Sequence, residues 1–221
     1  VATYKYCPFG GGPLKRVIID YKDRLSRLQL MIQQEGWDAY VATRQATLSW
    51  LLGTFAPWRT AVIVPAFGDP VALFWRLDAT RLKEESSWTW NAVVWGNDHN
   101  FAETIANQLK LLNVSEGKIG LDLGSPVTQQ LAPGLLLSAE YLELQHKLPE
   151  AQWTNAVPAI EALLAVKEEE EIQLLRKAAQ IADIGMEAAR DALEPGITEN
   201  AVAGVVEKAI RLAGSEWSWA D

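Results

Sequence analysis

Short apolar runs alternate with amphipathic segments over residues 21–160, and this alternation predicts strands interleaved with helices. Leu25, Leu28 and Ile32 recur at helical spacing and predict a helix that Gly36 ends. Apolar runs of a few residues, bounded by polar or turn-forming residues, predict strands. The predicted helices cover residues 22–35, 45–52, 77–85, 101–112 and 138–147. The predicted strands cover residues 38–43, 61–64, 71–75, 92–95, 118–122 and 153–156.

A turn separates two of the predicted strands and fixes their relative direction. Residues 61–64 and 71–75 flank Phe67-Gly68-Asp69-Pro70, a sequence typical of a hairpin turn. These two strands are therefore predicted to be antiparallel. The fold class predicted for residues 21–160 is α/β, a mixed sheet covered by helices on both faces in three layers. Residues 1–20, with glycines at positions 10–12, are predicted to form an irregular N-terminal arm.

The pattern changes after Pro158, where strands give way to helices alone. A short apolar helix or turn is predicted over residues 160–166, followed by a long amphipathic helix over residues 168–193. Pro195-Gly196 breaks that helix, and Thr198 is a natural N-cap for another helix that ends near residue 213. Residues 161–221 are therefore interpreted as a linker helix and the opening helices of a second domain.

The last residues indicate that the second domain is cut short. Trp217 and Trp219 alternate with polar residues, as in the first residues of a strand. A domain that stopped there would not bury this strand or the apolar faces of the preceding helices. We therefore expect the sequence to be the front part of a longer two-domain protein.

Composition and charge exclude several classes of protein. The chain has 221 residues, of which 49% are hydrophobic and 22% charged, so wholesale disorder is excluded. The net charge of -8 and the pI of about 4.9 argue against a nucleic-acid partner. The sequence contains no apolar run of about 18 residues, so no membrane span is expected. The single cysteine, Cys7, forms no intrachain disulfide, and a cytoplasmic location is expected.

Residues that perform catalysis or bind metals are scarce. His99 and His146 are the only histidines, and the sequence has no CxxC, HExxH, GxGxxG or Walker motif. The acidic run 168–171 is consecutive, so its side chains point in different directions on a helix and do not converge on one metal. His99 follows Asp98 in a polar loop and is interpreted as a hydrogen-bonding loop residue, the alternative being an acid–base role. His146 is interpreted as a surface residue near a helix end. We therefore predict no catalytic residue and no metal ligand in this chain.

Five segments carry a resemblance to a known family. They are Lys167–Asp183, Leu193–Glu199, Ala213–Glu216, Arg24–Ala39 and Trp50–Phe55. Together they resemble the creatinase, prolidase and aminopeptidase P family of pita-bread metallohydrolases, over roughly residues 21–221. The resemblance implies a creatinase/prolidase-type N-terminal α/β domain, followed by the helical start of a truncated pita-bread α+β domain.

The resemblance also implies an activity that this chain does not complete. Family members hydrolyse C–N bonds. The substrate implied is a small peptide with its cleaved bond next to proline, or an amidine-like molecule. Two divalent metals are held by aspartate, histidine and glutamate ligands in the pita-bread domain, all downstream of residue 221. We therefore expect no cofactor on this chain and two divalent metals in the missing catalytic portion. That portion would be the rest of the polypeptide or a separate chain.

One loop is the candidate for a direct role in substrate access. The resemblance implies that the loop before the central hairpin reaches into the active site of a neighbouring subunit, and here that loop is residues 55–59. Phe55, Trp58 and Arg59 are the candidate residues, because an aromatic side chain would close a pocket and a guanidinium would pair with a substrate carboxylate. The alternative is ordinary packing of Trp58, with Arg59 at the surface.

Two functions from different classes remain open. The first is the non-catalytic N-terminal portion of a metal-dependent C–N hydrolase, an Xaa-Pro peptidase or a creatinase-like enzyme, contributing homodimer contacts and substrate-access surfaces. The second is a stand-alone interaction or dimerisation module without catalytic activity. The ten tryptophans fit core packing or an aromatic subunit interface. A stand-alone module would be soluble without a partner, whereas a fragment would aggregate or dimerise.

Overall fold

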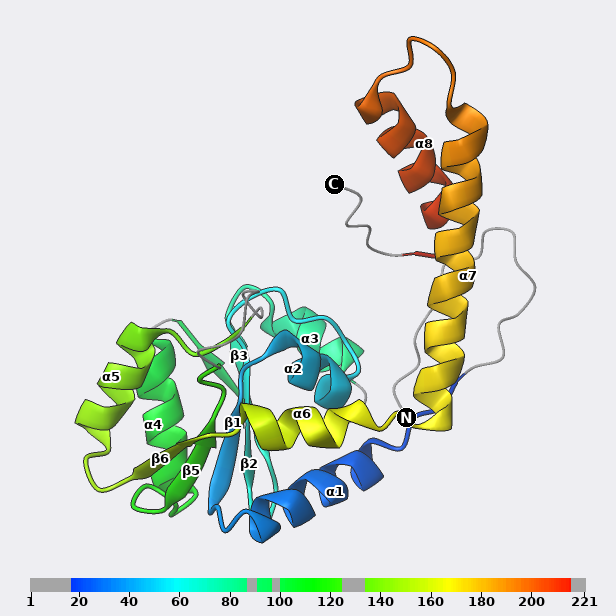
Figure 1. Cartoon of the computed structure of the whole chain (residues 1–221). Coiled ribbons are helices and arrows are strands. Elements are labelled where there is room, and N and C mark those ends of the chain that lie inside the picture. Colours follow the sequence, from blue (N-terminus) through cyan, green and yellow to red (C-terminus); the bar gives the residue numbers. More distant parts are fainter. Residues whose placement is uncertain (1–16, 87–90, 97–99, 125–133, 216–221) are drawn as a thin grey trace. The chain divides into compact units, whose positions relative to one another are not determined.

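The computed structural model describes residues 17–86, 91–96, 100–124 and 134–215. These residues form two compact units that meet in sequence between Val166 and Lys167. The first unit contains a sheet with its covering helices, and the second contains two helices (Figure 1).

The first unit is built on a six-stranded mixed sheet with strand order β4-β3-β2-β1-β5-β6. Strand β2 pairs antiparallel with β1 and β3, whereas the other neighbouring strands pair in parallel. The predicted hairpin is therefore confirmed as the β2–β3 pair. The strands are β1 (Ala39–Ala42), β2 (Ala61–Pro65), β3 (Val71–Trp75), β4 (Asn91–Trp95), β5 (Lys118–Leu121) and β6 (Gln152–Asn155).

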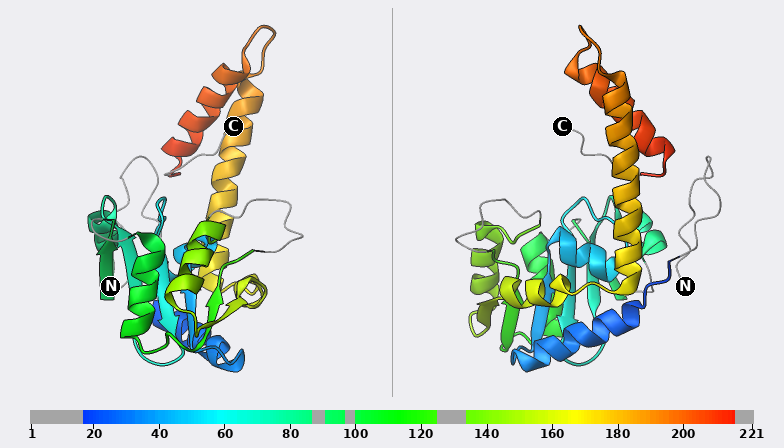
Figure 2. Two further views of the ribbon diagram at one scale, coloured as in Figure 1. Left: turned by 90° about the vertical axis from the view of Figure 1, so that its left-hand side faces the viewer. Right: turned by 45° about the vertical axis from the view of Figure 1, so that its right-hand side comes forward.

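Helices cover both faces of this sheet, as predicted, and make three layers (Figure 2). Side chains alternate along the strands, so that Tyr40 enters one hydrophobic core and Val41 enters the other. The first core also contains residues of α1, α2, α3 and α6, and the second contains residues of α4 and α5. The helices are α1 (Tyr21–Gln34), α2 (Gln45–Leu52), α3 (Ala79–Glu85), α4 (Phe101–Leu111), α5 (Ser138–Lys147) and α6 (Val157–Ala165).

Local sequence signals explain where these helices begin and end. Asp20 accepts hydrogen bonds from the backbone N–H groups of Lys22 and Asp23, and so caps the start of α1. Gly53 ends α2 with a φ of 72°, a conformation that costs other residues more. Helix α6 begins at Val157, earlier than the predicted residue 160, because a proline is tolerated in the first turn of a helix.

The strand directions bring distant parts of the sequence to one edge of the sheet. The carboxyl ends of β1, β3, β4, β5 and β6 lie at this edge, together with the amino end of β2. Residues 53–60, which join α2 to β2, therefore lie at the same edge of the sheet as the carboxyl ends of β3, β4 and β5. This arrangement places the candidate loop at the edge where open α/β sheets usually carry their sites.

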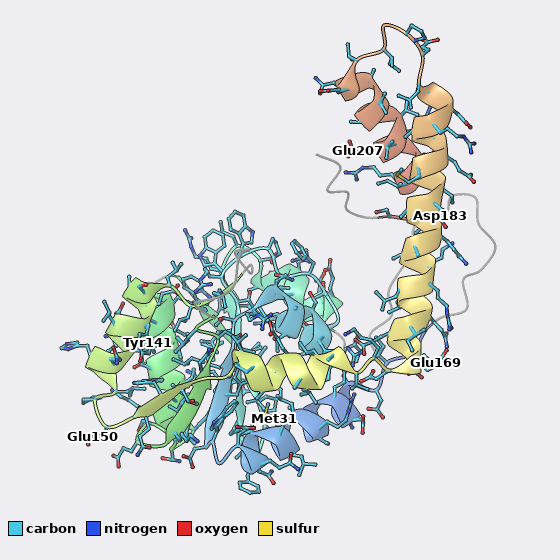
Figure 3. All side chains as sticks on the ribbon, viewed as in Figure 1. Met31, Tyr141, Glu150, Glu169, Asp183 and Glu207 are labelled. Carbon is cyan, nitrogen blue, oxygen red and sulfur yellow. The ribbon has the colours of Figure 1, made fainter. Side chains whose placement is uncertain are left out.

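The second unit contains the helices α7 (Glu169–Ala192) and α8 (Glu199–Leu212), which pack against each other. Thr198 caps α8 by accepting a hydrogen bond from the N–H of Ala201, as its sequence position predicted. Gly185 is buried where the helices meet, and a Cβ atom there would lie 2.7 Å from Cγ2 of Ile210. Figure 3 places Glu169 in the first turn of α7 and Asp183 near its middle.

Candidate functional site

The candidate loop presents two aromatic side chains to solvent. Phe55 is 38% exposed and Trp58 is 54% exposed, whereas Ala56 between them is buried. Tryptophan usually buries most of its surface in a folded protein, so a half-exposed ring at a sheet edge marks a surface able to bind an apolar group.

Trp58 is the exposed end of a row of aromatic rings. Its ring lies 4.8 Å from that of Trp75, which lies 6.4 Å from that of Trp95, measured between centroids. The Trp95 ring in turn lies 5.1 Å from that of Phe101, the first residue of α4. The rings are tilted against one another, an arrangement that stabilises aromatic pairs. The row runs across the carboxyl ends of β3 and β4, and its Trp75 ring packs against the ring of Trp58.

Arg59 is bound within the first unit. Its Nε donates to Oε1 of Glu140 at 3.0 Å, and its Nη2 donates to Oε2 of the same carboxylate. Its Nη1 donates to the carbonyl oxygens of Gly134 and Leu135, and its guanidinium lies 4.8 Å from the centroid of the Phe101 ring. A substrate carboxylate would have to displace Glu140 from this two-point contact.

A second arginine holds the start of the same loop. Nη2 of Arg81 donates to the carbonyl oxygen of Phe55 at 2.9 Å. The guanidinium also binds both carboxylate oxygens of Asp78, at 2.8 and 2.7 Å, and it contacts Glu85. The hydrogen bonds to Asp78 raise the pKa of Arg81, so this cation persists at every physiological pH. Glu85 also accepts a hydrogen bond from Oγ1 of Thr54 at 2.9 Å, which fixes the residue before Phe55.

Asp122 is a buried acidic residue at this edge that the sequence analysis did not single out. It directly follows β5, and its carboxylate accepts hydrogen bonds from the hydroxyl of Tyr40 and the backbone N–H groups of Thr43 and Arg44, at 2.8, 2.8 and 2.9 Å. Burial raises its pKa, against the opposing effect of these hydrogen bonds. Burial and the nearby Asp122 charge also raise the pKa of Tyr40 well above its usual value.

The contacts of Asp122 give it a structural role. Its Oδ2 accepts hydrogen bonds from the N–H groups of both Thr43 and Arg44, and so joins the end of β1 to the start of α2, which has no side-chain cap of its own. Asp122 is only 1% exposed to solvent and is already bound to three donors, so it is not positioned to transfer protons to a ligand. The sequence signal that could have pointed to Asp122 is its position directly after a buried strand.

In the part of the chain that the structure describes, no three His, Cys, Asp or Glu side chains lie close enough together to hold a metal ion. His146 lies exposed in the last turn of α5, as predicted. Cys7, Asp98 and His99, and the tryptophans at 88, 90, 217 and 219, lie outside the described residues. None of the described helices is both long and apolar enough to span a membrane.

The fold and this edge define an α/β domain whose described surface offers aromatic contacts and no metal-binding cluster. A family profile described as Creatinase/Prolidase N-terminal domain matches residues 24–166. The chain therefore belongs to the creatinase/prolidase N-terminal domain family, as the sequence motifs indicated. The match covers the first unit.

Comparisons with individual proteins agree with the family assignment. The chain is 28% identical over 129 residues to the putative dipeptidase YkvY of Bacillus subtilis (strain 168), a match covering 58% of this chain and 33% of that protein. The prolidase from Pyrococcus horikoshii OT3 has a similar structure, with a TM-score of 0.69 and 18% identity over 88% of this chain and 50% of that one.

A third similar structure is that of a family domain on its own. It is the creatinase/prolidase N-terminal domain of an X-Pro dipeptidase from Streptococcus pyogenes, with a TM-score of 0.50 and 18% identity. The match covers 63% of this chain and 98% of that domain. In contrast, the chain spans only a third of the Bacillus dipeptidase and half of the Pyrococcus prolidase.

Proposed function

We propose that this chain is the non-catalytic N-terminal portion of a metal-dependent Xaa-Pro peptidase and that it contributes dimer contacts and a substrate-access surface. The family assignment of residues 24–166 and the relatives described as dipeptidases and prolidases support this proposal. A creatinase-like enzyme acting on an amidine-like substrate is the alternative within the same family. The proposed enzyme is cytoplasmic.

The catalytic groups of the proposed enzyme belong to a portion outside this chain. The described residues hold no cluster able to bind even one metal ion, so two divalent metals do not fit this part of the protein. Bound in the catalytic portion, they would activate water and polarise the scissile carbonyl. No step of that chemistry is assigned to residues of this chain.

The exposed apolar side chains of α7 support the existence of that further portion. Leu174, Leu175 and Met186 are 48%, 55% and 70% exposed on α7, the helix that packs against α8. Large apolar side chains of an amphipathic helix are normally buried against another part of the protein. We propose that the catalytic portion covers them.

The single observation that carries the access role is the half-exposed ring of Trp58, supported by Trp75 at the sheet edge. We propose that Phe55, Trp58 and Arg59 form the access segment, with Phe55 and Trp58 as the side chains that contact substrate at the site of a neighbouring protomer. A flat apolar ring suits the side chain or proline ring of a small peptide.

Replacing Trp58 tests this role in the assembled enzyme. Trp58→Ala should raise KM for an Xaa-Pro dipeptide by roughly tenfold with little change in kcat, because about 1.4 kcal/mol of substrate binding is lost. Phe67→Ala is the matched control, since Phe67 is an exposed aromatic residue in the turn at the opposite edge of the sheet. Equal KM values for the Trp58 variant and the unaltered enzyme would refute the access role.

A further inference from the structure

Residues 55–59 form no regular secondary structure, so contacts at the two ends of the segment fix its shape. At the first end, Arg81 binds the carbonyl oxygen of Phe55. At the second end, Glu140 binds the guanidinium of Arg59. Trp58 lies between these two attachments, next to the second.

Glu140 is itself held firmly by the helix to which it belongs. Oε2 of Glu140 accepts a hydrogen bond from the backbone N–H of Leu137 at 2.8 Å, which caps the first turn of α5. A carboxylate at this position also interacts favourably with the helix dipole. Its side chain is only 14% exposed, so the contact with Arg59 is protected from water. Glu140 therefore offers Arg59 a partner of fixed position.

The position of Arg59 is passed on to the aromatic row through its backbone. The carbonyl oxygen of Arg59 accepts a hydrogen bond from Nε1 of Trp95 at 3.1 Å. The Trp95 ring contacts that of Trp75, and Trp75 supports Trp58. Holding Arg59 thus orients Trp58 in two ways, through the adjacent peptide bond and through the row of rings.

We infer that Glu140 is a positioning residue for the access surface, acting through Arg59, and that Arg59 is its internal partner and not a ligand of the substrate carboxylate. This inference rests on the proposed function for the enzymatic effect. The geometric part concerns this chain alone. Arg59 has two of its three nitrogens on Glu140, and its side chain is 28% exposed. Helix α5 and the access segment thus form one preorganised surface.

The test separates two roles of Glu140: its two-point contact with Arg59, called the clamp, and its hydrogen bond to Leu137, which caps α5. Glu140→Gln keeps an oxygen for the N–H of Leu137 but loses the charged two-point contact with Arg59. Arg59→Lys keeps the positive charge but loses the two-nitrogen contact that the guanidinium makes with Glu140. Glu143→Gln, on the same helix, is the matched control, since Glu143 binds Asn100 and Lys147 instead.

The first readout is spectroscopic and needs only this chain. The rings of Trp58 and Trp75, whose centroids are 4.8 Å apart, couple excitonically and give a couplet in the circular dichroism spectrum. For each variant, the couplet is the difference between its spectrum and that of the same variant carrying Trp58→Phe as well. We expect Glu140→Gln and Arg59→Lys to reduce its amplitude by roughly half or more, with an unchanged far-ultraviolet spectrum. The Glu143→Gln variant should keep the full couplet. An unchanged couplet in both clamp variants would overturn the inference.

The second readout is kinetic and uses the assembled enzyme. Glu140→Gln and Arg59→Lys should each raise KM for an Xaa-Pro dipeptide by roughly threefold to tenfold and leave kcat nearly unchanged. Both variants combined with Trp58→Ala should add little to the effect of Trp58→Ala alone, because they act through that ring. Additive effects would overturn the inference. A different outcome would refute the access function but support the positioning role of Glu140. In that outcome Trp58→Ala leaves KM unchanged, while Glu140→Gln and Arg59→Lys lose the couplet.

Discussion

Asp122 shows at the scale of one residue how the site edge is stabilised. Its carboxylate binds three donors from β1 and the start of α2, so strand and helix are joined through one side chain. The carboxylate is buried, and burial disfavours its charged form more than these hydrogen bonds favour it. Asp122 therefore links the stability of the first unit to pH.

The sign of this linkage gives a prediction. A carboxyl whose pKa is raised above its ordinary 3.8 binds its proton more tightly in the folded chain, so its contribution to stability is largest at low pH and is lost as the pH rises through the folded pKa. The free energy of unfolding of the native chain, minus that of Asp122→Asn, should therefore fall as the pH rises above the ordinary carboxyl pKa of 3.8. Urea denaturation followed by tryptophan fluorescence measures both values.

The control for this experiment removes a charge without disturbing the edge. Asp69→Asn lies at an exposed position in the turn between β2 and β3. Subtracting its pH dependence accounts for the loss of one negative charge from an acidic chain. A corrected difference that rises with pH would contradict the account, since it would mean that the folded chain prefers the ionised carboxylate.

The sequence predicted elements better than contacts, and Arg59 shows why. Helices and strands bury one face each, so the spacing of apolar residues within one segment is enough to predict the element. The predicted antiparallel hairpin and three-layer sheet were confirmed. The partner of Arg59 is Glu140, which is distant in sequence and adjacent only after β2 and α5 meet at the sheet edge. Nothing near Arg59 in the sequence distinguishes an internal clamp from a substrate ligand.

At the scale of elements, Gly185 and Gly204 make a matched pair in the second unit. Both are helical glycines, on α7 and α8, and alanine at either position gains roughly 0.5–1 kcal/mol of helix propensity. A Cβ atom at Gly185 would lie 2.7 Å from Cγ2 of Ile210 and 3.4 Å from Cγ1 of Val206, whereas one at Gly204 would have no neighbour within 4 Å. The two substitutions therefore differ mainly in packing.

We predict opposite effects for these two substitutions. Gly185→Ala should destabilise the α7–α8 pair by roughly 1–2 kcal/mol, because overpacking outweighs the gain in propensity. Gly204→Ala should stabilise it by up to about 1 kcal/mol. Thermal unfolding followed by far-ultraviolet circular dichroism measures both. A stabilising Gly185→Ala would show that the two helices do not meet at this glycine.

At the scale of the whole molecule, the chain holds one family domain and the two helices that follow it. The family profile accounts for residues 24–166, and the chain spans half of the Pyrococcus prolidase. We expect the proposed catalytic portion to cover the apolar side chains that are exposed on α7. We expect the proposed access surface to act only in an assembled enzyme.

The native mass of the protein, measured without denaturation and with metal analysis of the same sample, tests this account most directly. We predict that the 24.5 kDa sequence occurs within a heavier polypeptide, or bound to a second chain, with about two divalent metal ions per protomer. A mass of 24.5 kDa, or twice that value, with no metal and no second chain would contradict the peptidase proposal. The chain would then be a stand-alone interaction or dimerisation module.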